Sequence, residues 1–236
     1  MVAAKKWKPW SAGRWILKRM AWIFLAGIFV TVIQVMVFRV FNPPITVSTI
    51  WDYAWSMVEN EPYQVPAYKW RDLAGISPHL RRAVLASEDQ RFLDHGGFDF
   101  TELSIAVKDI MEEHRVRGAS TISMQAARSL FLVPSRSLVR KAAEAWYTLL
   151  MELFWNKKRI LEIYLNTVDW GTGIMGAEAA ANRYFNRSSQ HLTREESALM
   201  AAVLPSPHRW LANRPDQHVL LRQKRILRDM EKMTIP

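Results

Sequence analysis

The chain has 236 residues, half of them hydrophobic, with no cysteine and a formal net charge of +10. This length suits one globular domain with a short appendage, and the lack of cysteine excludes disulfides and thiolate metal sites. The basic balance points either to nucleic acid or to an anionic membrane surface as a partner.

The N-terminus combines a basic cluster with a long apolar run. Ala21–Phe38 has 18 residues without a charge, and as a helix it extends over roughly 27 Å, close to the hydrocarbon thickness of a bilayer. An excess of basic residues before such a run places that end in the cytoplasm. The sequence therefore predicts the membrane as a partner, and no nucleic acid. The six basic residues of the first 20 positions, where no acid occurs, are Lys5, Lys6, Lys8, Arg14, Lys18 and Arg19.

Two other interpretations of the apolar run are weaker. A buried core helix would show an amphipathic period, which this run lacks. A signal peptide would end in a small-x-small cleavage site, and the segment 39–44 contains none. We therefore expect a cytoplasmic tail at 1–20 and an uncleaved single-pass anchor at 21–41 in the bacterial cytoplasmic (inner) membrane, with the remaining chain outside the cytoplasm.

The rest of the chain predicts a linker and one helical domain. Asn42-Pro43-Pro44 breaks the anchor helix, and we expect a juxtamembrane linker with one short helix at 42–74, followed by the domain at 75–236. Few segments alternate as strands do, so the predicted fold class is mainly α. Apolar residues recur at spacings of three and four in the segments 79–94, 100–113, 121–131, 138–156, 158–166, 173–184, 193–204 and 217–231.

An acidic motif, Glu88–Gly97, closes the first of these helical segments. If the helix continues through it, Glu88, Phe92 and His95 stand at i, i+4 and i+7 and share one face. A carboxylate beside an aromatic ring is partly desolvated and therefore more basic. The alternative is a solvated helix end with a capping histidine, and the spacing by itself leaves both open.

Two further segments combine cations with polar groups. Thr121, Gln125 and Arg128 predict a donor face at a helix N-terminus, where backbone N–H groups can bind an anion such as pyrophosphate. Arg140 and Glu144 are i, i+4 neighbours, which suits a phosphate-binding cation oriented by a carboxylate. The alternatives are an ordinary capped helix and a surface ion pair that contributes little.

Taken together and in this order, the motifs resemble those of the family 51 glycosyltransferases, the peptidoglycan glycosyltransferase domain. That family carries E-D-x-x-F-x-x-H-x-G, G-x-S-T-x-x-Q-Q, R-K-x-x-E and K-x-x-I-L-E-x-Y-L-N. Glu88–Gly97, Arg140–Glu144 and Lys157–Asn166 match the first, third and fourth throughout. The resemblance covers about residues 75–230. Only a few residues follow the matched region, and in this respect the chain is similar to the monofunctional members of the family rather than to the bifunctional penicillin-binding proteins.

The resemblance implies a lysozyme-like helical domain with a small membrane-dipping jaw. It implies transfer of a growing lipid-linked glycan onto the GlcNAc 4-hydroxyl of lipid II, with inversion and release of undecaprenyl pyrophosphate. Glu88 would be the general base, and Glu144 a second catalytic carboxylate that orients nearby cations. The residues implied to bind or shape the substrate site are Asp89, Phe92, His95, Thr121, Gln125, Arg128, Arg140 and Lys141.

The resemblance also bears on cofactors and partners. It implies no organic cofactor and leaves open a divalent cation, Mg or Mn, at Glu88 or Glu144. The expected partners are lipid II, the growing lipid-linked glycan, the membrane, and other proteins of cell-wall synthesis or division.

The second motif departs from the family pattern. Met124 replaces the first of two paired glutamines, and Arg128 and Ser129 replace a lysine and an asparagine. Methionine cannot replace the hydrogen bonds of glutamine, and arginine keeps the charge but changes its shape. We expect Met124 and Arg128 to stand in the phosphate site. Two other functions stay open, a lytic glycosidase of lysozyme-like fold, which also uses two carboxylates, and an inactive cell-wall scaffold.

Overall fold

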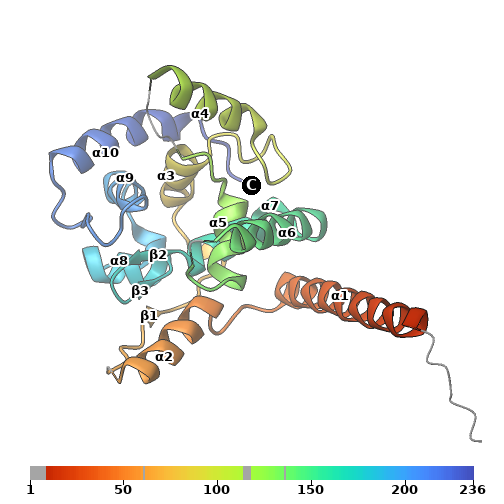
Figure 1. The fold of residues 1–236 in the computed structure, drawn as a ribbon. Coiled ribbons are helices and arrows are strands. Elements are labelled where there is room, and N and C mark those ends of the chain that lie inside the picture. Colours follow the sequence, from red (N-terminus) through yellow and green to blue (C-terminus); the bar gives the residue numbers. More distant parts are fainter. Residues whose placement is uncertain (1–8, 61, 114–117, 136) are drawn as a thin grey trace, which may run out of the picture.

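The structure, a computed structural model, describes residues 9–60, 62–113, 118–135 and 137–236. One long helix, α1 (Pro9–Val40), projects from a body of shorter helices (Figure 1). The chain is mainly α-helical with few strands, as the sequence predicts. The basic residues among positions 1–8 lie outside the described residues.

The shorter helices follow the predicted segments closely, because polar residues cap most of their first turns. They are α2 (Val47–Glu59), α3 (Pro78–Glu88), α4 (Phe100–Glu113), α5 (Ile122–Phe131), α6 (Leu138–Phe154), α7 (Lys157–Thr167), α8 (Ala177–Phe185), α9 (Arg194–Val203) and α10 (Gln217–Asp229). The capping side chains that accept a backbone N–H include Thr121, Ser137, Asn156, Thr193 and Asp216.

Helix α1 is long and apolar enough to cross a membrane. Its candidate span is Gly13–Val40, and only 6% of the most apolar stretch is buried. A core helix of a soluble protein would be mostly buried, so this low burial fits the single-pass anchor that the sequence predicts.

Helix α5 lies in the middle of the domain and packs against α6 and α7, while α3 packs against α9 and α10. Ala126 and Ala127 of α5 are fully buried, as is Tyr164 of α7. The small side chains on α5 let the neighbouring helices approach closely, so that α5 and its neighbours form one core. As a result, the C-terminal end of α3 faces the start of α5, where the first two motifs meet.

A small sheet replaces the beginning of one predicted helix. Its strand order is β1 (Ala67–Tyr68), β3 (Ile174–Met175), β2 (Asp169–Gly171), with β1 parallel and β2 antiparallel to β3. Gly176 follows β3 with φ +80°, and a Cβ at this position would come within 2.6 Å of the Asn166 carbonyl oxygen. The helix expected from residue 173 therefore begins only at Ala177, because residue 176 cannot be helical.

The first predicted helix is also shorter than expected. It ends at Glu88 instead of 94, because Asp89 adopts φ −162° and ψ 79° and its side chain accepts the backbone N–H of Ile122 at 3.0 Å. The prediction that Glu88, Phe92 and His95 share one helical face is wrong. Phe92 and His95 lie instead in the compact turn that follows Glu88.

Glu178 of α8 joins the segment before α3 to the domain. Its carboxylate is almost fully buried and accepts hydrogen bonds from Arg71 Nη2 at 2.8 Å and from Ser188 and Ser189. Burial by itself would raise the pKa of Glu178, but these hydrogen bonds outweigh it and lower the pKa to about 2. The ionised carboxylate is therefore part of what stabilises the fold.

We expect Glu178→Gln to destabilise the domain at neutral pH by about 2 kcal/mol, because the buried, ionised acceptor of Arg71, Ser188 and Ser189 is lost. The pKa in the folded state lies below the ordinary value of 4.5, so this contribution is present above pH 4.5 and is lost as the pH falls toward 2. Thermal melts of both proteins between pH 7 and pH 3 should show a difference in melting temperature that narrows on acidification. A difference that stays constant over this range would contradict the assignment.

Candidate active site

Two cavities meet at the side of α5. The first has a volume of about 420 Å³ and is lined by Glu88 and Arg222 among others. The second has a volume of about 850 Å³ and is lined by Arg140. Gln125 and Arg128 line both cavities, so the two adjoin, and together they are called the cleft below.

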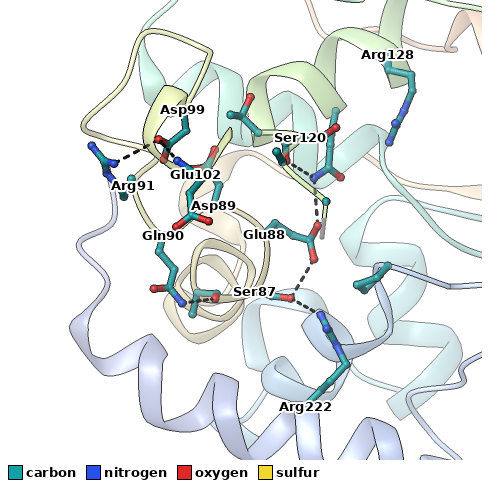
Figure 2. Close-up of a pocket in the computed structure, with 16 residues that line it drawn as sticks. Ser87, Glu88, Asp89, Gln90, Arg91, Asp99, Glu102, Ser120, Arg128 and Arg222 are labelled. Carbon is teal, nitrogen blue, oxygen red and sulfur yellow. Dashed lines mark hydrogen bonds and ion pairs between the residues drawn. The ribbon is translucent and has the colours of Figure 1, made fainter. Parts of the chain in front are cut away.

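Glu88 is the last residue of α3, and its carboxylate faces the first cavity (Figure 2). Gln125 Nε2 donates to Oε2 at 3.1 Å, and the Ser87 hydroxyl lies 3.0 Å from Oε1. Burial raises the pKa of Glu88, and the hydrogen bonds from Gln125 and Ser87 and the charge of Arg222 offset this only in part. The carboxylate is therefore more basic than an exposed glutamate, which suits a proton acceptor.

The side-chain amide of Gln125 is oriented by a tyrosine behind it. The buried Tyr164 hydroxyl donates to Gln125 Oε1 at 3.2 Å, so the amide nitrogen must face Glu88. The three side chains come from α7, α5 and α3. The hydrogen bonds that join them hold the Glu88 side chain in one orientation from the core side.

Arg222 of α10 is a site residue that the sequence did not indicate. Its Nη2 donates to the Ser87 hydroxyl at 3.3 Å and its Nε to the Ala202 carbonyl at 3.1 Å. It stands three residues after the buried Val219 and four before the buried Ile226. A charged residue on the buried face of an amphipathic helix was the available signal, because such a residue needs a partner inside.

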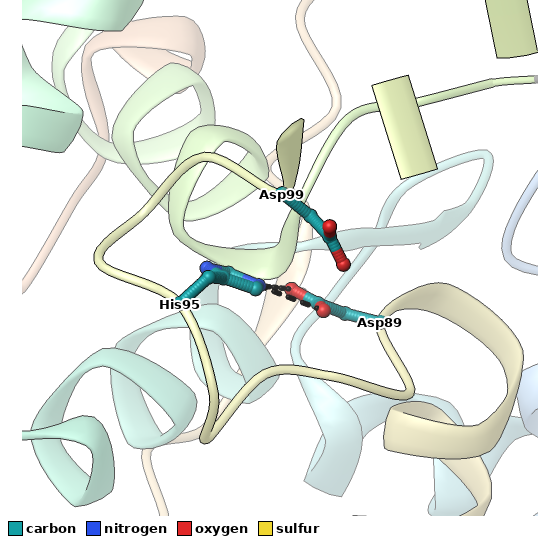
Figure 3. Close-up of side chains that lie close together, drawn as sticks. All are labelled: Asp89, His95 and Asp99. Carbon is teal, nitrogen blue, oxygen red and sulfur yellow. Dashed lines mark hydrogen bonds and ion pairs between the residues drawn. The ribbon is translucent and has the colours of Figure 1, made fainter. Parts of the chain in front are cut away.

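The loop after Glu88 is closed by a histidine–carboxylate pair (Figure 3). The two Asp89 oxygens lie 3.0 and 3.2 Å from His95 Nε2, and His95 Nδ1 accepts the backbone N–H of Gly97 at 3.1 Å. Because Nδ1 accepts, a neutral His95 carries its proton on Nε2 and donates it to Asp89. Phe92 is buried with its ring edge-on to His95. Of Asp89, Phe92 and His95, only Asp89 lines the first cavity, and the other two support it from behind.

The same pair is part of a group of possible metal ligands. Within the described residues, Asp89, His95 and Asp99 form a group whose ligand atoms lie within 4.8 Å of one another, and Asp99 Oδ2 is buried without a hydrogen-bond partner. To bind a metal ion, His95 Nε2 would have to lose the proton that it donates to Asp89. A neutral ring would then carry this proton on Nδ1, which already accepts the backbone N–H of Gly97. The donor set does not fit a three-ligand site in this arrangement, because the histidine tautomer is the wrong one.

The cation site predicted at Glu88 or Glu144 would need the same oxygens that already have partners. Both oxygens of Glu88 lie within hydrogen-bond distance of Ser87 or Gln125. Both oxygens of Glu144 contact cations. A divalent ion there would compete with these contacts and stays a prediction of the resemblance.

The two arginines of the cleft have different surroundings. Arg128 is exposed and lines both cavities, and within the described part of the chain no hydrogen bond or ion pair involves its guanidinium. Arg140 lines the second cavity and its Nη1 contacts Glu144 Oε2 at 2.7 Å. Glu144 is fully buried, and its other oxygen contacts Lys141 Nζ at 2.8 Å. Glu144 and Lys141 line neither cavity, so Arg140 alone of these three faces the cleft.

The second motif is divided between the cleft and the core. Thr121 is buried at the start of α5, where its hydroxyl donates to the Gly97 carbonyl at 2.6 Å and accepts from Met124 N at 3.2 Å. Met124 is 8% exposed and lines neither cavity. The expectation that Met124 stands in the phosphate site is therefore wrong, since its position on α5 faces the packed interior. Ser129, by contrast, lines the second cavity.

The cleft combines a basic carboxylate in the first cavity with two guanidinium groups, of which Arg128 lines both cavities and Arg140 lines the second. Guanidinium groups bind phosphate oxygens and stabilise charge that develops on a leaving group, while the carboxylate can accept a proton from a nucleophile. Such a combination is typical of a group-transfer enzyme.

Comparison with known proteins specifies that class. Residues 58–231 match the transglycosylase family. The biosynthetic peptidoglycan transglycosylase of Shewanella oneidensis is 43% identical over 219 residues, which are 93% of this chain and 91% of that protein. Those of Caulobacter vibrioides (43% over 204 residues, 86% of each chain) and Xanthomonas campestris pv. campestris strain B100 (44% over 223 residues, 94% of this chain and 89% of that protein) are similar as well. The chain belongs to the transglycosylase family, and the resemblance drawn from its motifs is confirmed. It is a glycosyltransferase.

We expect Gln125→Leu to shift the acid limb of the pH–rate profile of glycosyl transfer to higher pH. The amide of Gln125 stabilises the ionised form of Glu88, so its loss raises the pKa of Glu88 further. Ser87→Ala is the matched control and should shift the limb less, because the single hydroxyl proton of Ser87 is shared between Glu88 and the Ala201 carbonyl. An acid limb that stays in place in Gln125→Leu would mean that Glu88 is not the group that titrates.

Proposed function

We propose that this chain polymerises peptidoglycan glycan strands, with lipid II as the acceptor and a growing lipid-linked strand as the donor. The observation that supports this most directly is the cleft itself, where Glu88, with its raised pKa, adjoins the cavity of Arg128 and Arg140. The relatives are named biosynthetic peptidoglycan transglycosylases, and their name supplies the substrate class.

Glu88 takes the proton of the GlcNAc 4-hydroxyl of lipid II in the first cavity. The oxygen then forms a bond to C1 of the MurNAc at the lipid end of the donor, and the bond from C1 to the phosphate oxygen breaks with inversion. The hydrogen bonds from Ser87 and Gln125 keep the carboxylate ionised and aimed before the reaction.

The donor pyrophosphate lies in the second cavity, next to the two arginines. Negative charge grows on the pyrophosphate as the bond to C1 breaks, and preformed cations stabilise that charge more in the transition state than in the ground state. Glu144 contacts Arg140 from the core side, so the guanidinium has little freedom to turn away. Arg128 lacks such a partner within the described residues and adapts to the second phosphate group.

A lytic glycosidase receives less support from the same geometry. Such an enzyme places two carboxylates on either side of the scissile bond. The second carboxylate that the sequence offers, Glu144, lines neither cavity and has both oxygens in contact with cations. Other proteins of cell-wall synthesis or division stay predicted partners.

The sharpest test compares the two glutamates. We expect Glu88→Gln to lower the rate of polymerisation on the order of a hundredfold to ten-thousandfold, because it removes the base and keeps the shape. Binding of a pyrophosphate donor mimic should be retained. The melting temperature at pH 7 should rise, since the ionised, desolvated Glu88 destabilises the fold above its raised pKa.

Glu144→Gln is the matched comparison. We expect it to weaken donor binding together with the rate, because Arg140 and Lys141 lose their common anionic partner. Rate, inhibitor affinity and thermal melts are measured for both variants. Glu88→Gln with more than about a tenth of the original rate would refute the general-base role. If Glu144→Gln abolishes the reaction and leaves donor binding intact, the roles must be exchanged: Glu144 would be the general base, and Glu88 the carboxylate that orients the cations.

We further propose that the N-terminus lies in the cytoplasm and the domain outside the cytoplasmic membrane. The basic residues before the apolar span of α1 support this orientation. A reporter that is active only after export, fused after Pro236, should be active. Activity of a cytoplasm-only reporter at the same place would refute the topology, and with it a substrate that is polymerised outside.

A further inference from the structure

Part of the wall of the second cavity comes from helix α2, which lies largely before the family match. Ser48 and Asp52 of α2 line this cavity, and both precede residues 58–231, which match the transglycosylase family. They stand at i and i+4 and therefore share one face of the helix. Helix α2 packs against α5 (Figure 1), whose residues Gln125 and Arg128 line the same cavity. The segment expected to be a linker is thus part of the cleft.

The start of α2 is fixed on the small sheet by buried hydroxyl groups. Thr46 caps the helix by accepting the backbone N–H of Thr49 at 3.3 Å, and the Thr49 hydroxyl donates to the Met175 sulfur of β3 at 3.8 Å. Thr46 and Thr49 are both buried. The Tyr63 hydroxyl donates to the Thr49 carbonyl at 3.3 Å. These contacts hold the cavity-facing side of α2 at a defined place.

The Asp52 carboxylate makes no contact that stabilises the fold. Within the described residues no hydrogen bond or ion pair involves it. Its side chain is exposed on the cavity wall, yet burial still raises the pKa of Asp52, and the charge of Asp169 raises it further. Asp169 lines the same cavity and contacts His208 Nε2 at 2.7 Å. A carboxylate that is partly desolvated beside a second one destabilises the fold slightly, which favours a role in binding.

The charges that line the second cavity come from different elements. Arg128 and Arg140 belong to α5 and α6, whereas Asp52 and Asp169 belong to α2 and β2. Among the described residues, neither carboxylate forms an ion pair with either arginine. A phosphate is attracted by the arginines and repelled by the carboxylates. Carboxylates accept hydrogen bonds from hydroxyl and N–H groups, which N-acetylated sugars carry. A lipid-linked glycan has both kinds of group.

We propose that Asp52 is a specificity-determining residue of the second cavity, which accepts hydrogen bonds from the donor glycan and keeps the pyrophosphate beside the arginines by repelling it from α2. The identity of the donor rests on the proposed function. A pyrophosphate that lay against α2 would hold C1 of the donor away from Glu88. Repulsion from Asp52 disfavours that arrangement, and such discrimination against a wrong pose is a general source of specificity.

Two substitutions at Asp52 separate its charge from its hydrogen bonds. Asp52→Asn removes the charge and keeps an oxygen acceptor, whereas Asp52→Ala removes both. Glu59→Gln is the matched control, because Glu59 is an exposed acid at the end of the same helix and lines neither cavity. Each variant of the full chain is compared with the unchanged protein in detergent at neutral pH. Thermal melts check that the variants are folded.

Binding of inorganic pyrophosphate, measured by calorimetry, tests the repulsion. We expect both Asp52 variants to bind it about threefold more tightly or better, because one repelling charge is lost, and Glu59→Gln to bind it as before. Arg128→Ala should weaken this binding. If Arg128→Ala weakens it and both Asp52 variants leave it unchanged, the proposal for Asp52 is overturned while the donor site stands. Binding that does not depend on Arg128 would refute the placement of the pyrophosphate, and the proposal with it.

The kinetics of polymerisation test the contact with the glycan. Asp52→Asn and Asp52→Ala both lack the charge, so the difference between them reports the hydrogen bonds. We expect the KM for the lipid-linked donor to be about tenfold higher in Asp52→Ala than in Asp52→Asn, with similar kcat values, because a contact away from C1 is made equally in the ground state and the transition state. Equal KM values would overturn the glycan contact. A lower kcat at an unchanged KM would assign Asp52 to the chemical step and overturn its role in specificity.

Discussion

The Asp89 carboxylate accepts hydrogen bonds from the start of α5 and from His95, and the position of the proposed catalytic groups depends on this contact. The contact ends α3 at Glu88, so the Glu88 carboxylate leaves the helix axis and faces the first cavity. It also holds the following loop against α5, where Thr121 donates to the Gly97 carbonyl. Three segments separated in the sequence are thereby fixed relative to each other, which a site with a defined proton acceptor requires.

Around this contact, the Glu88 carboxylate is kept out of a direct ion pair with Arg128 and Arg140 among the described residues. The raised pKa of Glu88 results mainly from burial, which costs folding free energy whenever the group is ionised. Within the described residues neither Arg128 nor Arg140 forms an ion pair with Glu88, although Arg128 lines the first cavity as well as the second. An enzyme that needs both a base and an anion site benefits from this separation, because a direct ion pair would lower the pKa of the carboxylate.

The same helices connect this chemistry to the membrane. Helix α6 contributes Arg140 to the cleft, buries Glu144 behind it, and donates to α1 through Trp146 and Tyr147. The jaw and the lysozyme-like form that the resemblance implies stay predictions. Phe131, one of the aromatic residues near the cleft, is buried, and its ring stacks on that of Tyr147.

The sequence by itself determined the membrane helix, the mainly helical class and the four motifs. Each of these depends on residues near one another in the chain, through a run without charge or a spacing of three and four. It also indicated Glu88, Gln125, Arg128 and Arg140, because each of them falls within a motif that is long enough to be recognised from the sequence. Only the tertiary structure decided the end of α3 and the burial of Met124. It alone brought Arg222 beside Ser87, from 135 positions away. These features arise from contacts between distant segments, and local periodicity carries no information about which distant groups will meet.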